Sequence, residues 1–110
     1  MTKRIPQVNS LIKQELGKIF LEELEWPEGV LVTIIQVETT RDLREARVWI
    51  SVLPIDKSQA VLKVLYGNAK NLQRILHGRL VMKPLPKLRF DLDTTEEKAG
   101  KMDKLLGELS

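Results

Sequence analysis

Two neighbouring segments constrain the fold of this chain more than any other feature of its sequence. Residues 30–40 (VLVTIIQVETT) are rich in valine, isoleucine and threonine, which favour a pleated strand. The next segment alternates in the manner of a half-buried strand, with apolar residues at Ala46, Val48, Ile50 and Val52. Only residues 41–45 separate the two strands, and so short a connection predicts an antiparallel hairpin.

Helical periodicity surrounds this hairpin. Apolar residues recur at steps of three and four in the first part of the chain and again after Pro54. The expected elements are helices at about 5–25, 57–66 and 69–81, a third strand at about 87–92, and a short last helix after a capping box at Thr94–Glu97. The predicted fold is therefore an α+β domain with the order α-β-β-α-α-β and a short C-terminal helix.

Length and composition limit the class of protein. A chain of 110 residues predicts one domain over residues 1–110. The absence of cysteine excludes disulfides and thiol chemistry, and it fits a cytoplasmic protein. No apolar run approaches the ~20 residues of a membrane span, and no signal-peptide pattern opens the chain, so we expect no membrane partner.

Basic residues are concentrated in one part of the chain. The net charge is only +3, but residues 57–89 carry basic side chains and no acid: Lys57, Lys63, Lys70, Arg74, Arg79, Lys83, Lys87 and Arg89. Such a segment of one sign predicts a positive surface that binds phosphate. The alternative is a chance cluster that acidic residues elsewhere in the chain offset after folding.

Part of this segment has helical spacing. Lys63, Lys70, Arg74 and His77 follow one another at steps of seven, four and three, which predicts one stripe if the two central helices are nearly continuous. Such a row could track a nucleic-acid backbone, whereas the alternative is an ordinary solvated helix face. The predicted RNA-binding set adds further cations: Lys3, Arg4, Arg79, Lys83, Lys87 and Arg89.

Catalysis has little support. His77 is the only histidine, and no spacing of metal ligands, nucleophile elbow or phosphate-binding glycine loop is present. We expect no enzyme activity, catalytic residue, metal, cofactor or small-molecule substrate. Only Trp49 and Tyr66 are candidates for stacking on bases, so contacts to the backbone of structured RNA are favoured.

The stretch Tyr66–Asn71 (YGNAKN) joins the two central helices. We expect Gly67 to end the first helix in a left-handed conformation and Asn68 to cap the second. Lys70 would then lie in the first turn of the second helix, free to contact phosphate. On this interpretation Gly67→Val disturbs folding, while Lys70→Glu spares folding and weakens RNA binding.

Several stretches, in their order and spacing, resemble the ribosome-binding factor A family, whose members are bacterial small-subunit maturation factors. The resemblance covers nearly the full chain, and it is carried by Arg4–Leu16, Val32–Ile34, Val37–Leu43, Ala46–Ser51, Pro86–Phe90 with Asp93, and Met102–Asp103 before Leu105–Leu106. It implies a type II KH-like core of the order α-β-β-α-α-β. In that family an Ala-x-Gly motif kinks the two central helices. The matching positions here are Asn68, Ala69 and Lys70, next to Gly67, so both defining residues of the motif are absent from this sequence.

The same resemblance implies a function. Members bind the immature small ribosomal subunit in the cytoplasm and assist late maturation of its ribosomal RNA around the 5′-terminal helix, without catalysis or cofactor. We expect a monomer. Two alternatives stay open on the residues alone: a DNA-binding helix-turn-helix around Gly67, and a protein-interaction adaptor whose basic charge is incidental.

Overall fold

The computed structural model describes residues 4–80 and 85–93. In chain order it contains helix α1 (Arg4–Glu22), strands β1 (Leu31–Thr39) and β2 (Glu45–Leu53), a single 3-10 turn (Ile55–Lys57), helices α2 (Ser58–Gly67) and α3 (Ala69–Arg79), and strand β3 (Lys87–Leu92). This order confirms the predicted α-β-β-α-α-β pattern. The predicted capping box and last helix lie outside the described residues.

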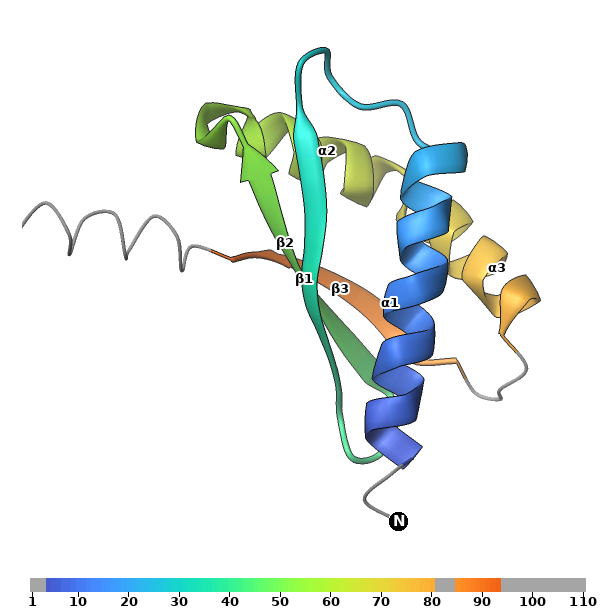
Figure 1. The fold of residues 1–110 in the computed structure, drawn as a ribbon. Coiled ribbons are helices and arrows are strands. Elements are labelled where there is room, and N and C mark those ends of the chain that lie inside the picture. The colour runs from blue at the N-terminus through green and yellow to red at the C-terminus, as the bar shows by residue number, and fades with distance from the viewer. Residues whose placement is uncertain (1–3, 81–84, 94–110) are drawn as a thin grey trace, which may run out of the picture.

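The three strands form one sheet in the order β1-β2-β3. The strands β1 and β2 pair antiparallel as the predicted hairpin, with a bulge between Ile34 and Gln36, whereas β3 pairs parallel to β2. A parallel neighbour needs a long crossover, and α2 and α3 provide it. Figure 1 shows α1 beside β1, with α2 passing behind β1 and α3 continuing next to α1.

The helices cover one face of the sheet. Alternate residues of β2 are buried, as predicted, because they face the helices: Ala46, Val48, Ile50 and Val52. They pack in one cluster with apolar residues of all three helices, including Ile12, Leu65 and Leu76. The opposite face of β2 carries Arg47 and Trp49, which are only partly buried. The described residues therefore share a single hydrophobic core.

The first helix is shorter than predicted. It ends at Glu22, not near residue 25, because Trp26 folds back on its last turn. The indole Nε1 of Trp26 donates a hydrogen bond of 3.0 Å to the carbonyl oxygen of Phe20, which would otherwise accept from the next helical turn. The two rings meet edge to face, with centroids 5.2 Å apart. Leu24 is still buried although it lies beyond the helix.

The hairpin turn is held by a local polar network. Asp42 accepts hydrogen bonds from the Thr40 hydroxyl (2.7 Å) and from the Arg44 backbone N–H (3.1 Å). These bonds, the Thr40 bond first, lower the pKa of Asp42 below its usual value. Leu43 adopts φ of 60°, a left-handed conformation that is uncommon for a leucine. The polar segment 41–45 thus turns as predicted.

No helix within the described residues is long and apolar enough to cross a membrane.

Candidate nucleic-acid interface

The break between α2 and α3 lies at one residue, Asn68. Its backbone has φ of −111° and ψ of 10°, outside the helical range, although its N–H still bonds back to the carbonyl of Val64 at 3.1 Å. The carbonyl of Asn68 accepts from the N–H of Leu72 at 2.8 Å. Backbone hydrogen bonding is therefore nearly continuous from α2 to α3. The direction of the helix axis nevertheless changes between them (Figure 1).

The structure corrects how this break is made. Gly67 was expected in a left-handed conformation, but it is the last residue of α2, and Gly29 is the glycine with positive φ among the described residues. Asn68 was expected to cap α3, but its side chain makes no such bond. Instead its Nδ2 donates to the Val64 carbonyl at 2.8 Å, so the amide satisfies the end of the preceding helix.

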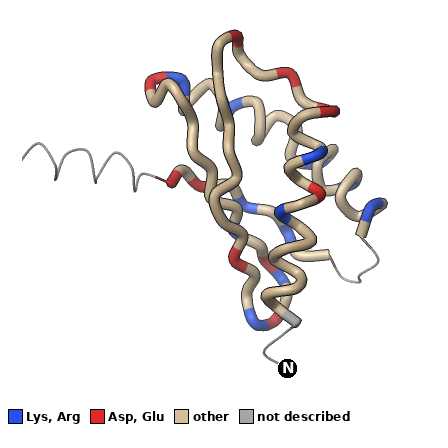
Figure 2. Tube along the Cα trace, viewed as in Figure 1, with Lys and Arg blue, Asp and Glu red and all other residues tan. Residues whose placement is uncertain are grey.

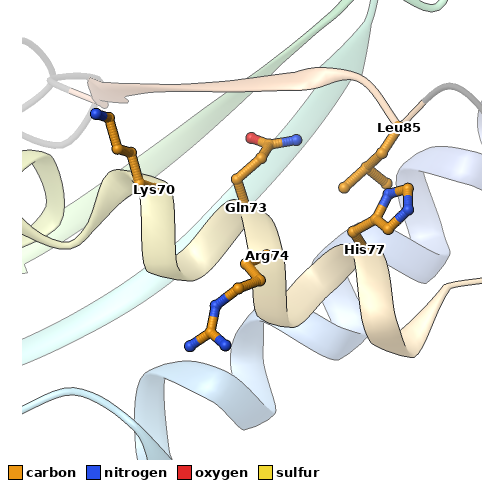
Figure 3. Close-up of a pocket in the computed structure, with 5 residues that line it drawn as sticks. All are labelled: Lys70, Gln73, Arg74, His77 and Leu85. Carbon is orange, nitrogen blue, oxygen red and sulfur yellow. The ribbon is translucent and has the colours of Figure 1, made fainter.

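One face of α3 carries three of the predicted RNA-binding residues. Lys70, Arg74 and His77 line an open depression, together with Gln73 of the same helix and Leu85 of the segment before β3. Figure 3 shows that Gln73 extends toward the strand, that His77 lies beside Leu85, and that Arg74 points away from the strand. The three basic side chains form a row along the helix and do not converge on one point. A row of this kind suits an extended chain of phosphates better than a single small anion.

Gln73 positions this helix, and the sequence interpretation missed it. Its Nε2 donates to the Pro86 carbonyl at 2.7 Å, and its Oε1 accepts from the Leu88 N–H at 3.0 Å. The two bonds hold α3 against the start of β3. The spacing could have revealed it, since Gln73 stands three residues after Lys70 and four before His77, on the same helix face.

The basic side chains of this face have few internal partners. Among the described residues, no carboxylate lies within 4.0 Å of Lys63, Lys70 or Arg74, and the last of these donates to the Asn71 side chain at 2.6 Å. Lys63, Lys70, Arg74 and His77 are all exposed. Figure 2 shows acids on the connection between α1 and β1, which carries no basic residue, whereas α2 and α3 carry no acid. The positive charge of Lys63, Lys70 and Arg74 is therefore open to solvent.

Two other predicted cations have acidic neighbours in the folded protein. Arg79 lies 3.1 Å from Glu22 and 3.6 Å from Glu15, both on α1. Arg89 lies 3.6 Å from Asp91 and 3.9 Å from Glu45. Glu15, Glu22 and Glu45 come from distant parts of the chain, and Asp91 lies just beyond the acid-free segment. Acids near the folded segment were the alternative explanation for the charge pattern. This explanation applies at these two arginines, of which Arg79 ends α3, and not at Lys63, Lys70 or Arg74.

The remaining predicted residues are scattered. Lys63 is on α2, across the break, and does not line the depression. Lys87 is exposed on β3, near Tyr66 and Glu45. Arg4 begins α1, while Lys3 and Lys83 lie outside the described residues. The single stripe predicted from Lys63 to His77 therefore holds within α3 only.

The two candidate stacking residues are both engaged. Tyr66 is 57% exposed, but its hydroxyl donates to the Phe90 carbonyl on β3 at 2.9 Å. The guanidinium of Arg47 lies 5.3 Å from the ring centroid of Trp49, on the sheet face away from the helices. Neither ring lies in the depression on α3, so phosphate contact is the chemistry that this face offers.

The structure also bears on two other functions, metal binding and DNA binding by a helix-turn-helix. Within the part of the chain that the structure describes, no group of three histidines or acids could hold a metal ion. The helix pair also differs from a DNA-binding helix-turn-helix, whose helices are joined by a turn of about three to four residues. Here Asn68 alone separates α2 from α3.

Comparison with known proteins gives a consistent result. The family model of ribosome-binding factor A matches residues 4–106. The ribosome-binding factor A of Akkermansia muciniphila is 32% identical over 109 residues, which cover 99% of this chain and 86% of the relative. That of Chlorobium phaeovibrioides is 36% identical over 110 residues, which cover 96% of this chain and 91% of the relative.

Solved structures share the fold. The crystal structure of ribosome-binding factor A from Thermus thermophilus matches with a TM-score of 0.57 at 21% identity, and the match covers 79% of this chain and 89% of that one. A solution structure of a Thermotoga maritima protein matches with a TM-score of 0.59 at 20% identity, over 82% and 83% of the two chains. At such identities the similarity concerns the fold alone, and it confirms the expected KH-like α+β arrangement.

Proposed function

Because this chain belongs to the ribosome-binding factor A family, we propose that it is a ribosome assembly factor that binds the immature small ribosomal subunit. On this proposal it assists late maturation of the ribosomal RNA around the 5′-terminal helix. It acts in the cytoplasm as a monomer, without catalysis and without a cofactor.

The single observation that carries the RNA-binding part is the open positive charge of α2 and α3. Lys63, Lys70 and Arg74 are exposed on helices that have no acid, and no described carboxylate is within ion-pair distance of them. Unpaired surface cations of this kind bind phosphates and release counterions. His77 and Lys87 are the secondary contacts. Arg79 contributes less because Glu22 and Glu15 pair with it, and Arg89 contributes less because it lies near Asp91 and Glu45.

The mechanism that fits is stabilisation of one RNA conformation. Phosphate contacts fix register and orientation but carry no sequence information. The bonds of Gln73 to Pro86 and Leu88 hold α3 against the start of β3, so the helix that carries the row has a fixed position relative to the sheet. RNA conformers whose phosphates match that surface become more populated, and ribosomal RNA processing then proceeds on them. The protein itself makes and breaks no covalent bond.

Sedimentation of cell extract tests the proposal. We expect the protein in the fractions of free small subunits at low salt. The bound fraction should fall steeply as the salt concentration rises. A protein that is absent from these fractions, and is found on DNA or in another complex, would contradict the proposal.

Direct competition separates the RNA proposal from the two alternatives. Small-subunit ribosomal RNA should displace duplex DNA from the protein, whereas a DNA-binding module would show the reverse order. A protein adaptor would keep its partner after charge reversal at Lys70 and Arg74. The salt dependence gives a further check, since a binding constant that barely changes between low and physiological salt excludes phosphate contacts as the main source of affinity.

A further inference from the structure

A groove on another part of the surface has a different chemistry. It has a volume of about 370 Å³ and lies between the second half of α1 and the first half of β1. Phe20, Leu21 and Trp26 line one side, and residues 30–34 line the other. At its rim Leu21 is 87% exposed and Leu31 is 60% exposed. Exposed apolar side chains grouped around a groove are typical of a surface that binds a partner.

The strand beside this groove has an open edge. Because β1 is an outer strand of the sheet, one side of its backbone faces away from β2. Two side chains of α1 bond to that side further along: Asn9 accepts from the Thr39 N–H at 3.0 Å, and Lys13 donates to the Ile35 carbonyl at 3.3 Å. In the described structure no side chain of α1 makes such a bond to Leu31–Ile34. The backbone of this stretch is therefore free to pair with an added strand.

A glycine inside α1 faces the same groove. Gly17 lies in the middle of the helix, where glycine is less favourable than alanine. A Cβ placed on Gly17 would meet nothing within 4 Å, so no neighbour in the described structure requires the missing side chain. Its φ is not in the positive range either. What the glycine does is lower the wall of the groove, which lets another backbone come close to the helix.

We propose that this groove binds an extended segment of a partner protein. The segment pairs with β1 beside Leu31–Ile34 and places apolar side chains against Phe20 and Trp26. A carboxylate of the segment lies near Lys13, the one charged side chain among the described residues that line the groove. This site is separate from the basic face of α3 and does not depend on RNA binding.

Two other occupants fit less well. RNA would find one lysine and otherwise largely apolar surface among the described lining residues, which offers little to a chain of phosphates. A second copy paired along β1 would be blocked beyond Ile34, because Lys13 and Asn9 already bond to the edge at Ile35 and Thr39. Only a short open edge remains, and that suits a peptide segment better than a dimer.

A peptide titration tests the proposal. Trp49→Phe leaves Trp26, in the groove, as the one tryptophan of the chain and thus a fluorescent reporter. The probe is an acetylated peptide of alternating valine and threonine that ends in aspartate. We expect a saturable change in Trp26 fluorescence and amide NMR shifts centred on residues 30–34. Gly17→Leu should weaken binding by about tenfold or more because it fills the groove, and Lys13→Gln by roughly threefold.

The controls separate this site from the RNA interface. Gln14→Leu adds the same side chain on an exposed part of α1 outside the groove, and it should bind the peptide like the parent. Gly17→Leu should bind ribosomal RNA normally, so failure of one proposal leaves the other intact. The groove proposal is overturned if no saturable change occurs up to about 1 mM peptide, or if folded Gly17→Leu binds the peptide normally. It is also overturned if an RNA oligonucleotide produces the same Trp26 change, or if Gly17→Leu abolishes self-association in sedimentation velocity.

Discussion

Arg79, at the end of α3, donates a hydrogen bond from Nη2 to Oε2 of Glu22, at the end of α1, across 3.1 Å. This bond to Glu22, more than the nearby charge of Glu15, raises the pKa of the Arg79 guanidinium above its usual value. The two residues are 57 positions apart in the sequence. Arg79, in the most basic part of the chain, thus links α3 to α1, and Glu22 and Glu15 balance its charge.

This pairing predicts a small role for Arg79 in RNA binding. Arg79→Gln should change the affinity for ribosomal RNA by less than about twofold, since it removes a charge that is already neutralised. Glu22→Gln should raise the affinity, because it removes one negative charge and leaves Arg79 paired only with Glu15, at 3.6 Å. Filter binding of labelled RNA at constant salt measures both. A loss with Arg79→Gln as large as that with Lys70→Gln would show that the ion pair opens when RNA binds.

A second prediction concerns the residue that fixes the basic helix. Gln73→Ala removes the bonds to the Pro86 carbonyl and the Leu88 N–H, both in partly buried positions. We expect the free energy of unfolding to fall by about 1–3 kcal/mol, because two backbone groups lose their partner. Urea denaturation checks this against Gln59→Ala, an exposed position on α2. Equal midpoints for the two variants would refute the positioning role.

The glycines give a third prediction, with opposite signs at different positions. Gly17→Ala should raise the free energy of unfolding by about 0.5–1 kcal/mol, because helix propensity improves and the new Cβ meets nothing within 4 Å. Gly67→Ala should also fold normally, since Gly67 is helical and a Cβ there would meet nothing within 4 Å. Gly29→Ala should lower stability by about 1–2 kcal/mol because φ is 76° there. Thermal unfolding shows whether each variant is more or less stable than the parent. A Gly17→Ala variant that is less stable would contradict the open space seen beside Gly17 on α1.

Local patterns predicted the elements well, for physical reasons that particular residues illustrate. Val48 and Ile50 are buried as expected because a strand with one covered face must alternate with a period of two. The helices were recognisable because their apolar residues have to reach one core. The end of α1 was misplaced, since nothing local indicates that Trp26 would bond to the carbonyl of Phe20.

The candidate site was less predictable because it depends on contacts across the chain. The acid-free segment could be read from the sequence, but the ion pairs of Arg79 with Glu22 and of Arg89 with Glu45 depend on acids brought close only by folding. The geometry at Asn68 was also missed, since an asparagine between two helices can cap either one, and its side chain bonds back to Val64. Sequence periodicity does not predict which of the two helices the Asn68 side chain will cap, because tertiary packing decides it.

The most direct test of the central claim is the affinity for small-subunit ribosomal RNA of a charge-reversed α3. The variant Lys70→Glu/Arg74→Glu is compared with Arg41→Glu/Arg44→Glu, which makes the same change in net charge on exposed residues of the hairpin turn. We expect both to fold, as circular dichroism would confirm. The α3 variant should lose about tenfold or more in affinity, and the slope of log affinity against log salt should fall by about two, while the turn variant stays near the parent. If the two variants lose affinity equally, or neither loses any, α3 is not the RNA-binding face.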